Sequence, residues 1–172
     1  MQFRETQDVK TFTCGNKDLD DFLTTEEVRR YEEQGFGRTY LVYCEGELVA
    51  YFTISNDGLR YEYLRKAAGF PALSEMVVDS MPASKIGRLA VSKGEKNLGI
   101  GRSLIIYIAK LAMETGARTG VRLLILEAKP DSVEFYRKCG FELTTMTRRE
   151  KRKMNRTMFM DLQPLRPLLP TG

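Results

Sequence analysis

The chain has 172 residues, of which 42% are hydrophobic and 29% are charged, and its net charge is +4. This composition is typical of a soluble globular protein with a substantial core, and no run of about 18 apolar residues indicates a membrane span. Histidine is absent, which excludes Ser-His-Asp and Cys-His nucleophiles and any histidine-ligated metal. The three cysteines, Cys14, Cys44 and Cys139, form no CxxC pair, so we expect free thiols and no metal site.

The first part of the chain predicts two short helices. The opening residues, MQFRETQDVKTF, lack the apolar core of a signal peptide, so we expect a cytoplasmic protein. Residues 14–23 predict a helix capped by Asn16, with Leu19, Phe22 and Leu23 on its apolar face. Residues 26–34 predict a charged, exposed helix that ends at the following glycines.

A β-hairpin is predicted over residues 38–55. Apolar residues alternate on either side of the turn Glu-Gly-Glu, with Asn56-Asp57-Gly58 predicted to end the second strand in a turn. Residues 59–71 fit a helical or irregular insertion over the sheet.

The second half predicts a strand–helix–strand crossover followed by antiparallel strands. We expect a strand over 83–92, a helix over 101–115 ended by Gly116 and Gly120, and a doubly covered strand over 121–128. Asp131 should cap a second helix that stops at Gly140. Strands at 141–145 and 157–162 flank a basic loop or hairpin at 147–156. The order predicts an α/β (α+β layered) fold around a mixed sheet, with one domain over residues 1–162 and a proline-rich tail over 163–172.

The stretch KGEKNLGIGRSL, residues 93–104, is the best candidate for a binding site. It joins a strand to a helix, where backbone amides lack intrahelical partners and the helix dipole favours an anion. A nucleoside-triphosphate loop is excluded because Ile100 and Gly101 stand where Lys and Ser or Thr are needed. A dinucleotide fingerprint is excluded because Leu104 stands where the third glycine is needed. A lone Gly-x-Gly fits a plain tight turn about as well as a phosphate site, but Lys93, Lys96 and Arg102 favour the latter.

Two segments together resemble the GNAT superfamily of acyl-CoA N-acyltransferases. They are IGRLAVSKGEKNLGIGRSL (86–104) and EFYRKCGFEL (134–143), and they match the family's Gln/Arg-x-x-Gly-x-Gly/Ala turn and its Phe-Tyr-x-x-x-Gly-Phe helix end. Lys96 departs from the family's glutamine or arginine, which puts cofactor affinity in doubt, because lysine lacks arginine's bidentate fork. The resemblance covers roughly residues 1–162, and it implies a mostly antiparallel sheet flanked by helices, with splayed central strands.

The N-terminal FTCGNKDLDDFL is similar to the opening of GNAT toxins in toxin–antitoxin pairs, as is IGRLAV. Those family members acetylate the amino group of aminoacyl-tRNA. The opening also fits a plain core-forming helix. The toxin resemblance implies aminoacyl-tRNA as substrate, an antitoxin partner and, from family habit, a homodimer.

The resemblance also implies roles for particular residues in binding acetyl-CoA. Main-chain groups of the strand around Ala90 would pair with the pantetheine arm, and an amide of Leu89 or Val91 would polarise the thioester carbonyl. The diphosphate would lie on the helix start, held by Lys96, Asn97, Leu98, Gly99, Ile100, Gly101, Arg102 and Ser103. Tyr136 would be the general acid for the departing thiolate. By itself, a tyrosine beside Phe135 on an apolar helix face is more often a packing residue.

No residue stands out as a general base, and Glu75 and Glu127 are candidates by position only. An α-amine has a pKa of about 7.7–8.0 and a lysine side chain one of about 10.4, so the lysine side chain has the greater need of a base. An α-amine acceptor is therefore favoured, and the basic run 147–156 could add a tRNA surface or be a solvated hairpin. Acetylation of a small amine or a protein N-terminus, and a non-catalytic module that binds CoA or RNA, stay open as alternatives.

Overall fold

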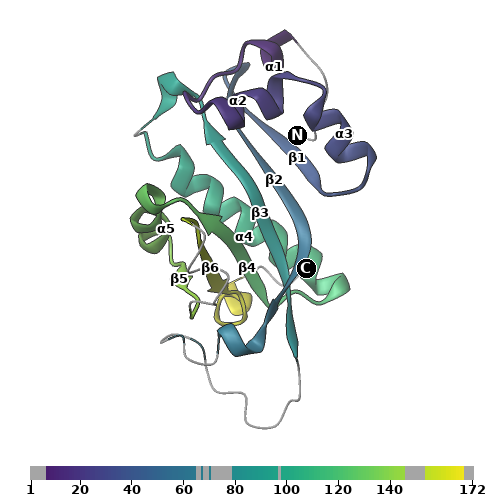
Figure 1. Cartoon of the computed structure of the whole chain (residues 1–172), viewed down its shortest axis with the longest axis vertical. Coiled ribbons are helices and arrows are strands. Elements are labelled where there is room, and N and C mark those ends of the chain that lie inside the picture. Colours follow the sequence, from purple (N-terminus) through teal and green to yellow (C-terminus); the bar gives the residue numbers. More distant parts are fainter. Residues whose placement is uncertain are drawn as a thin grey trace. The chain divides into compact units, whose positions relative to one another are not determined.

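The fold is described for residues 7–64, 67, 70, 79–96, 98–145 and 154–168 of a computed structural model. The chain divides into two units, one of Met1–Ser55 with Ile86–Leu104 and the other of Asn56–Lys85 with Ile105–Gly172. Six strands form one mixed, mostly antiparallel sheet in the order β1-β2-β3-β4-β6-β5 (Figure 1). The predicted layered α/β fold is confirmed, and the splay of the central strands stays a prediction.

In the first unit, three short helices pack on a hairpin. Helices α1 (Gln7–Thr11), α2 (Lys17–Thr24) and α3 (Glu27–Glu33) precede strands β1 (Arg38–Cys44) and β2 (Glu47–Arg60) (Figure 1). The predicted cap is present, because the Asn16 side-chain oxygen accepts from the Leu19 amide at 3.4 Å. Their apolar side chains form one buried cluster with the sheet: Val9, Phe12, Phe22, Leu23, Val28, Leu41, Tyr51 and Ala90.

The hairpin turns at Glu45 and Gly46, which both have positive φ, as a tight two-residue connection requires. A register shift between Val42 and Tyr43 changes which residues face one another. Val42 lies opposite Ala50, whereas Tyr43 lies opposite Leu48, so Val49 is an extra residue on β2. Residues 49–53 of β2 are buried, so this strand is covered on both faces.

The predicted turn at Asn56-Asp57-Gly58 is wrong, because β2 continues through it to Arg60. Glycine at 58 allows close approach of the neighbouring strand β3 (Ser80–Val91), since a methyl group there would lie 2.7 Å from the Ser80 hydroxyl oxygen. Leu59 then contributes to a buried cluster of the second unit. The predicted insertion after it begins with a 3-10 turn, Tyr61–Tyr63, and successive i to i+3 hydrogen bonds join Leu64, Ala67 and Phe70.

The second half follows the predicted order of elements. The chain runs from β3 to helix α4 (Ile100–Thr119), strand β4 (Leu123–Ala128), helix α5 (Val133–Lys138), and strands β5 (Glu142–Leu143) and β6 (Arg156–Asp161). Strand β4 pairs antiparallel with β6, and β6 pairs antiparallel with β5. Residues 123–126 are all at most 4% exposed, which confirms a strand covered on both faces.

In this half the predicted helix stop at Gly116 and the predicted cap at Asp131 are wrong, whereas the predicted stop at Gly120 is confirmed. Helix α4 continues through Gly116 and ends before Gly120, whose φ is +76°. Gly116 is needed instead for packing, since a methyl group there would lie 2.9 Å from the Val121 Cβ. Asp131 lies inside a 3-10 turn, Pro130–Ser132, and α5 starts after Ser132 without a side-chain cap. The tail begins with a 3-10 segment, Gln163–Leu168, in which Arg166 donates to the Val121 carbonyl at 2.6 Å.

Candidate functional site

The glycine-rich turn is tied to its own unit by main-chain hydrogen bonds. After β3, the amide of Ser92 donates to the Val49 carbonyl at 2.8 Å, and that of Lys93 donates to the Thr13 carbonyl at 2.9 Å. A short 3-10 turn, Lys93–Glu95, is closed by a bond from the Glu95 amide to the Ser92 carbonyl at 3.0 Å. Residues 92–95 therefore have a defined backbone shape.

The start of α4 offers backbone donors on an open surface. The Ser103 amide is bonded to the Gly99 carbonyl at 3.1 Å, and the amides of Ile100, Gly101 and Arg102 precede this first helical bond. Gly99 has a φ of +82°, and a methyl group there would meet nothing within 4 Å. Amide donors, a positive helix end and free space beside Gly99 fit a phosphate group.

Exposed cations surround this helix start. The side chains of Lys93, Lys96, Arg102 and Ser103 are exposed, and Leu98 is 69% exposed. The ammonium of Lys96 lies beside Gly15, since a methyl group at Gly15 would lie 3.9 Å from Nζ. Asn97 lies outside the described residues.

The last residues of β3 alternate in burial, as a strand between two layers should. Ala90 is 3% exposed and packs in the helical cluster of the first unit, whereas Leu89 and Val91 are only partly buried. Successive side chains of a strand point to opposite faces, so Leu89 and Val91 share a face and Ala90 lies on the other.

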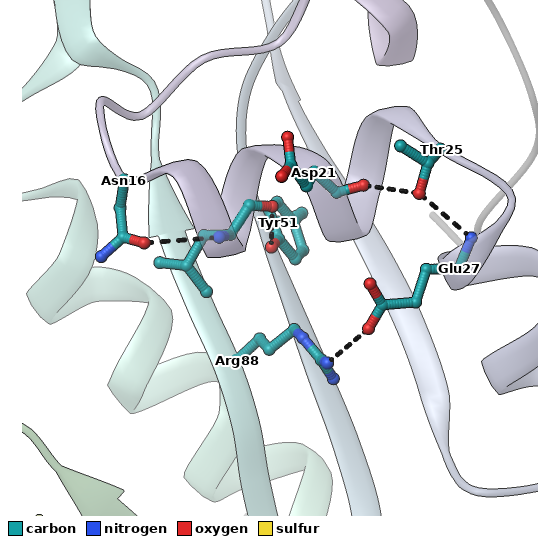
Figure 2. Close-up of polar contacts among 7 residues, drawn as sticks. Asn16, Asp21, Thr25, Glu27, Tyr51 and Arg88 are labelled. Atoms are coloured by element: carbon teal, nitrogen blue, oxygen red, sulfur yellow. Dashed lines mark hydrogen bonds and ion pairs between the residues drawn. The ribbon is translucent and has the colours of Figure 1, made fainter.

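Arg88 makes contacts that the sequence analysis missed. Its guanidinium lies 3.6 Å from the centre of the Phe22 ring and donates to the Glu27 carboxylate at 3.1 Å. Figure 2 shows this pair below α2, near Tyr51, whose hydroxyl donates to the Leu19 carbonyl at 2.7 Å. Burial raises the pKa of Tyr51 above its usual range, so this phenol is protonated and serves packing. The only available signal for Arg88 was its position inside the motif IGRLAV.

Tyr136 lies on α5, in the second unit, between two other aromatic rings. Its ring centre is 5.1 Å from that of Phe135 and 5.8 Å from that of Phe141, both in edge-to-face geometry. The Phe141 amide donates to the Tyr136 carbonyl at 3.0 Å where the chain turns at Gly140, whose φ is +93°. Burial raises the pKa of Tyr136 to about 12, with a smaller contribution from Cys139. The phenol is therefore protonated at neutral pH, which is the form a general acid requires.

Of the two candidate bases, Glu127 lies within the described residues and Glu75 does not. Glu127 lies on β4, and one of its carboxylate oxygens is 3.6 Å from the Lys85 ammonium, which is also 3.5 Å from the Asp57 carboxylate. Glu75 lies outside the described residues, as do residues 147–153 of the basic run.

No helix in the described part of the chain combines the length and apolar character that crossing a bilayer requires.

Comparison with known proteins adds a family and a set of similar folds. The family described as acetyltransferase (GNAT) matches residues 9–141. A tRNA-acetylating toxin of Mycobacterium tuberculosis (strain ATCC 25618 / H37Rv) is 23% identical over 142 residues, which are 81% of each chain.

Solved structures of toxins share the fold at low sequence identity. A bacterial toxin superposes with a TM-score of 0.83 at 17% identity, covering 100% of this chain and 95% of that one. The toxin AtaT, complexed with acetyl-methionyl-tRNAfMet, gives a TM-score of 0.77 at 20% identity, with 98% and 96% covered. A tyrosine-to-phenylalanine mutant of AtaT, bound to acetyl-CoA and the C-terminus of the antitoxin AtaR, gives 0.73 at 20% identity, with 99% and 97% covered.

Proposed function

The chain belongs to the acetyltransferase (GNAT) family, and we propose that it transfers the acetyl group of acetyl-CoA to the α-amine of aminoacyl-tRNA, as the toxin of a toxin–antitoxin pair. The observation that carries the proposal is the open start of α4, where backbone amides and a glycine with positive φ fit a diphosphate. Relatives that acetylate tRNA, or bind its acetylated form, support the choice of acceptor.

Binding of the cosubstrate would use mostly backbone groups of the first unit. The amides from Leu98 to Arg102 would hold the diphosphate, with Lys96 and Arg102 adding positive charge around it. The Ser103 amide already bonds to the Gly99 carbonyl, so Ser103 would contribute its exposed hydroxyl instead. Asn97 is assigned to the same turn from the family motif. The main chain of residues 89–91 would pair with the pantetheine arm as an added strand would.

Acetyl-CoA, when bound, supplies the activated thioester. An amide of Leu89 or Val91 would stabilise the developing charge on its carbonyl oxygen. Tyr136 would give its proton to the departing thiolate, and its raised pKa keeps that proton in place until transfer.

The acceptor is chosen partly because histidine is absent. About a tenth or more of an α-amine with a pKa of about 7.7–8.0 is neutral at pH 7, so water can take its proton. A lysine side chain with a pKa of about 10.4 would need a dedicated base. We place the enzyme in the cytoplasm, where charged tRNA is found. From the resemblance to the toxins we also propose that it binds an antitoxin and forms a homodimer.

The test is an acetylation assay with purified protein and labelled acetyl-CoA. Charged tRNA should be labelled at the aminoacyl group, and uncharged tRNA, free amino acids and lysine peptides should not. Expression in cells without an antitoxin should arrest growth. Labelling of a small amine or a protein N-terminus in place of charged tRNA would refute the acceptor but keep the enzyme class.

A further inference from the structure

The N-terminal turn, Thr13–Asn16, is organised by one carboxylate on α2. Asp20 accepts hydrogen bonds from the Cys14 amide at 2.7 Å and from the Thr13 hydroxyl at 2.9 Å. The Thr13 hydroxyl in turn accepts from the Gly15 amide at 3.3 Å. Gly15 has a φ of +79°, a conformation that favours glycine. Each carboxylate oxygen of Asp20 therefore has a separate donor in the N-terminal turn.

The electrostatics of the turn agree with this geometry. Burial raises the pKa of Asp20, but hydrogen bonds from Cys14, Thr13 and Gly15 lower it by more, so the pKa is below its usual value. Asp20 is therefore ionised at neutral pH and acts purely as an acceptor. The pKa of the Cys14 thiol is raised, first by burial and then by its hydrogen bond with Asp20, so this thiol stays protonated.

The N-terminal turn also contacts the proposed diphosphate turn directly. The carbonyl of Thr13, whose hydroxyl is bound to Asp20, accepts from the Lys93 amide at 2.9 Å. A few residues later, the Lys96 ammonium lies beside Gly15. Its charge lowers the pKa of the Cys14 thiol, but by less than burial and Asp20 raise it. One residue, Thr13, thus joins Asp20 to the segment that leads into α4, and all of these groups belong to one unit.

We infer that Asp20 is a positioning residue for coenzyme A: it fixes the N-terminal turn, and this turn holds the Lys93–Lys96 segment so that the amides at the start of α4 converge on the diphosphate. The inference rests on the proposed function and extends it to residues that would not touch the ligand. It gives a role to the N-terminal motif CGNKDLDDFL that a helix serving only the core would not have.

The test compares variants that break this connection with matched variants that keep it. Asp20→Asn keeps the size but replaces one acceptor oxygen with a donor group, and Thr13→Val keeps the shape but removes the hydroxyl. Thr13→Ser restores the hydroxyl. Asp21→Asn makes the same charge change one residue away, where the half-exposed carboxylate pairs with Lys17.

Coenzyme A binding is measured by calorimetry, and kinetics with acetyl-CoA are compared with those of S-acetylpantetheine, which has no diphosphate. We expect Asp20→Asn and Thr13→Val to weaken coenzyme A binding about tenfold and to raise the KM for acetyl-CoA with little change in kcat. Their kcat/KM for S-acetylpantetheine should stay within about twofold of wild type, and Thr13→Ser and Asp21→Asn should bind coenzyme A as wild type does. A general loss of structure would instead affect both acetyl donors alike.

The outcomes separate this inference from the proposed function. If the wild-type protein binds no coenzyme A, the proposed function itself fails. If the wild type binds it and Thr13→Val, folded by thermal melting, binds it equally well, the positioning role is refuted. Equal losses with acetyl-CoA and S-acetylpantetheine would also refute it. Should Asp20→Asn fail to fold, Thr13→Val and Thr13→Ser decide the question.

Discussion

The start of α4 and the end of α5 are both helix ends shaped by a glycine with positive φ, yet they are opposite in character. At Gly99 (φ +82°) an added methyl group would meet nothing within 4 Å, and at Gly140 (φ +93°) it would lie 3.6 Å from the Met160 methyl group. The first end is open and offers backbone amides, whereas the second is closed around Tyr136, which packs between the rings of Phe135 and Phe141. Under the proposed function, the first end would act through its backbone amides, whereas the second would act through a single side-chain atom, the Tyr136 hydroxyl oxygen.

The largest effect should follow from removing that atom. Tyr136→Phe keeps the ring and its edge-to-face contacts, so we expect coenzyme A affinity and the melting temperature to change little. Loss of the proton donor should lower kcat about 100- to 1000-fold, within the range of general acid catalysis. Tyr107→Phe, an exposed tyrosine on α4, is the control and should keep full activity. A Tyr136→Phe enzyme with wild-type kcat would make Tyr136 a packing residue.

The closed character of the second end can be measured by titration. Burial raises the pKa of Tyr136 to about 12, against about 10 in the unfolded chain. Between these values the unfolded chain loses its proton first, so the contribution of Tyr136 to folding stability is complete below about pH 10 and is lost as pH rises toward 12. The tyrosinate absorbance of wild type minus that of Tyr136→Phe should therefore rise about two pH units above that of a free tyrosine.

A difference spectrum that rises near pH 10 would show that the hydroxyl is fully solvated. The wild-type stability should then fall no faster than that of Tyr136→Phe between pH 10 and 11.5, contrary to our expectation.

The open end should be sensitive to backbone shape. Gly99→Ala forces a left-handed conformation on alanine, at a cost of about 1–2 kcal/mol, and puts a methyl group where the diphosphate would approach. We expect coenzyme A to bind about tenfold more weakly, by calorimetry. Gly35→Ala is a matched control, because Gly35 also has a positive φ (+71°) and free space around it. It should lose similar stability with unchanged affinity, and equal affinities for the two variants would exclude Gly99 from the site.

The sequence predicted both helix ends because their signals are local. Glycine adopts positive φ without strain, so it marks the residue before or after a helix, and the spacing of apolar residues predicts the helix itself. The same reasoning located the N-terminal helix and its Asn16 cap, which depend on residues three positions apart.

What failed depended on packing contacts that local sequence patterns do not reveal. Gly58 and Gly116 have the appearance of turn or stop residues, but each allows a close approach, to Ser80 and to Val121. Arg88 was missed because its partners, Phe22 and Glu27, lie about sixty residues earlier in the chain. Thr13 and Asp20 were quoted as part of a motif, but their connection to the Lys93 amide is a tertiary contact that no spacing predicts.

The smallest expected effect concerns the one departure from the family motif at the open end. Lys96→Arg restores a residue with a planar fork, which can donate two parallel hydrogen bonds to a phosphate. Because the Lys96 ammonium lies beside Gly15, part of its charge already serves the N-terminal turn, so we expect only about threefold tighter coenzyme A binding. Lys93→Arg, in the same turn and also exposed, should leave the affinity unchanged. If Lys96→Arg weakens coenzyme A binding instead, the contact of the Lys96 ammonium with Gly15 contributes more to binding than its charge near the diphosphate does. The open end would then depend on tertiary packing, as the closed end does.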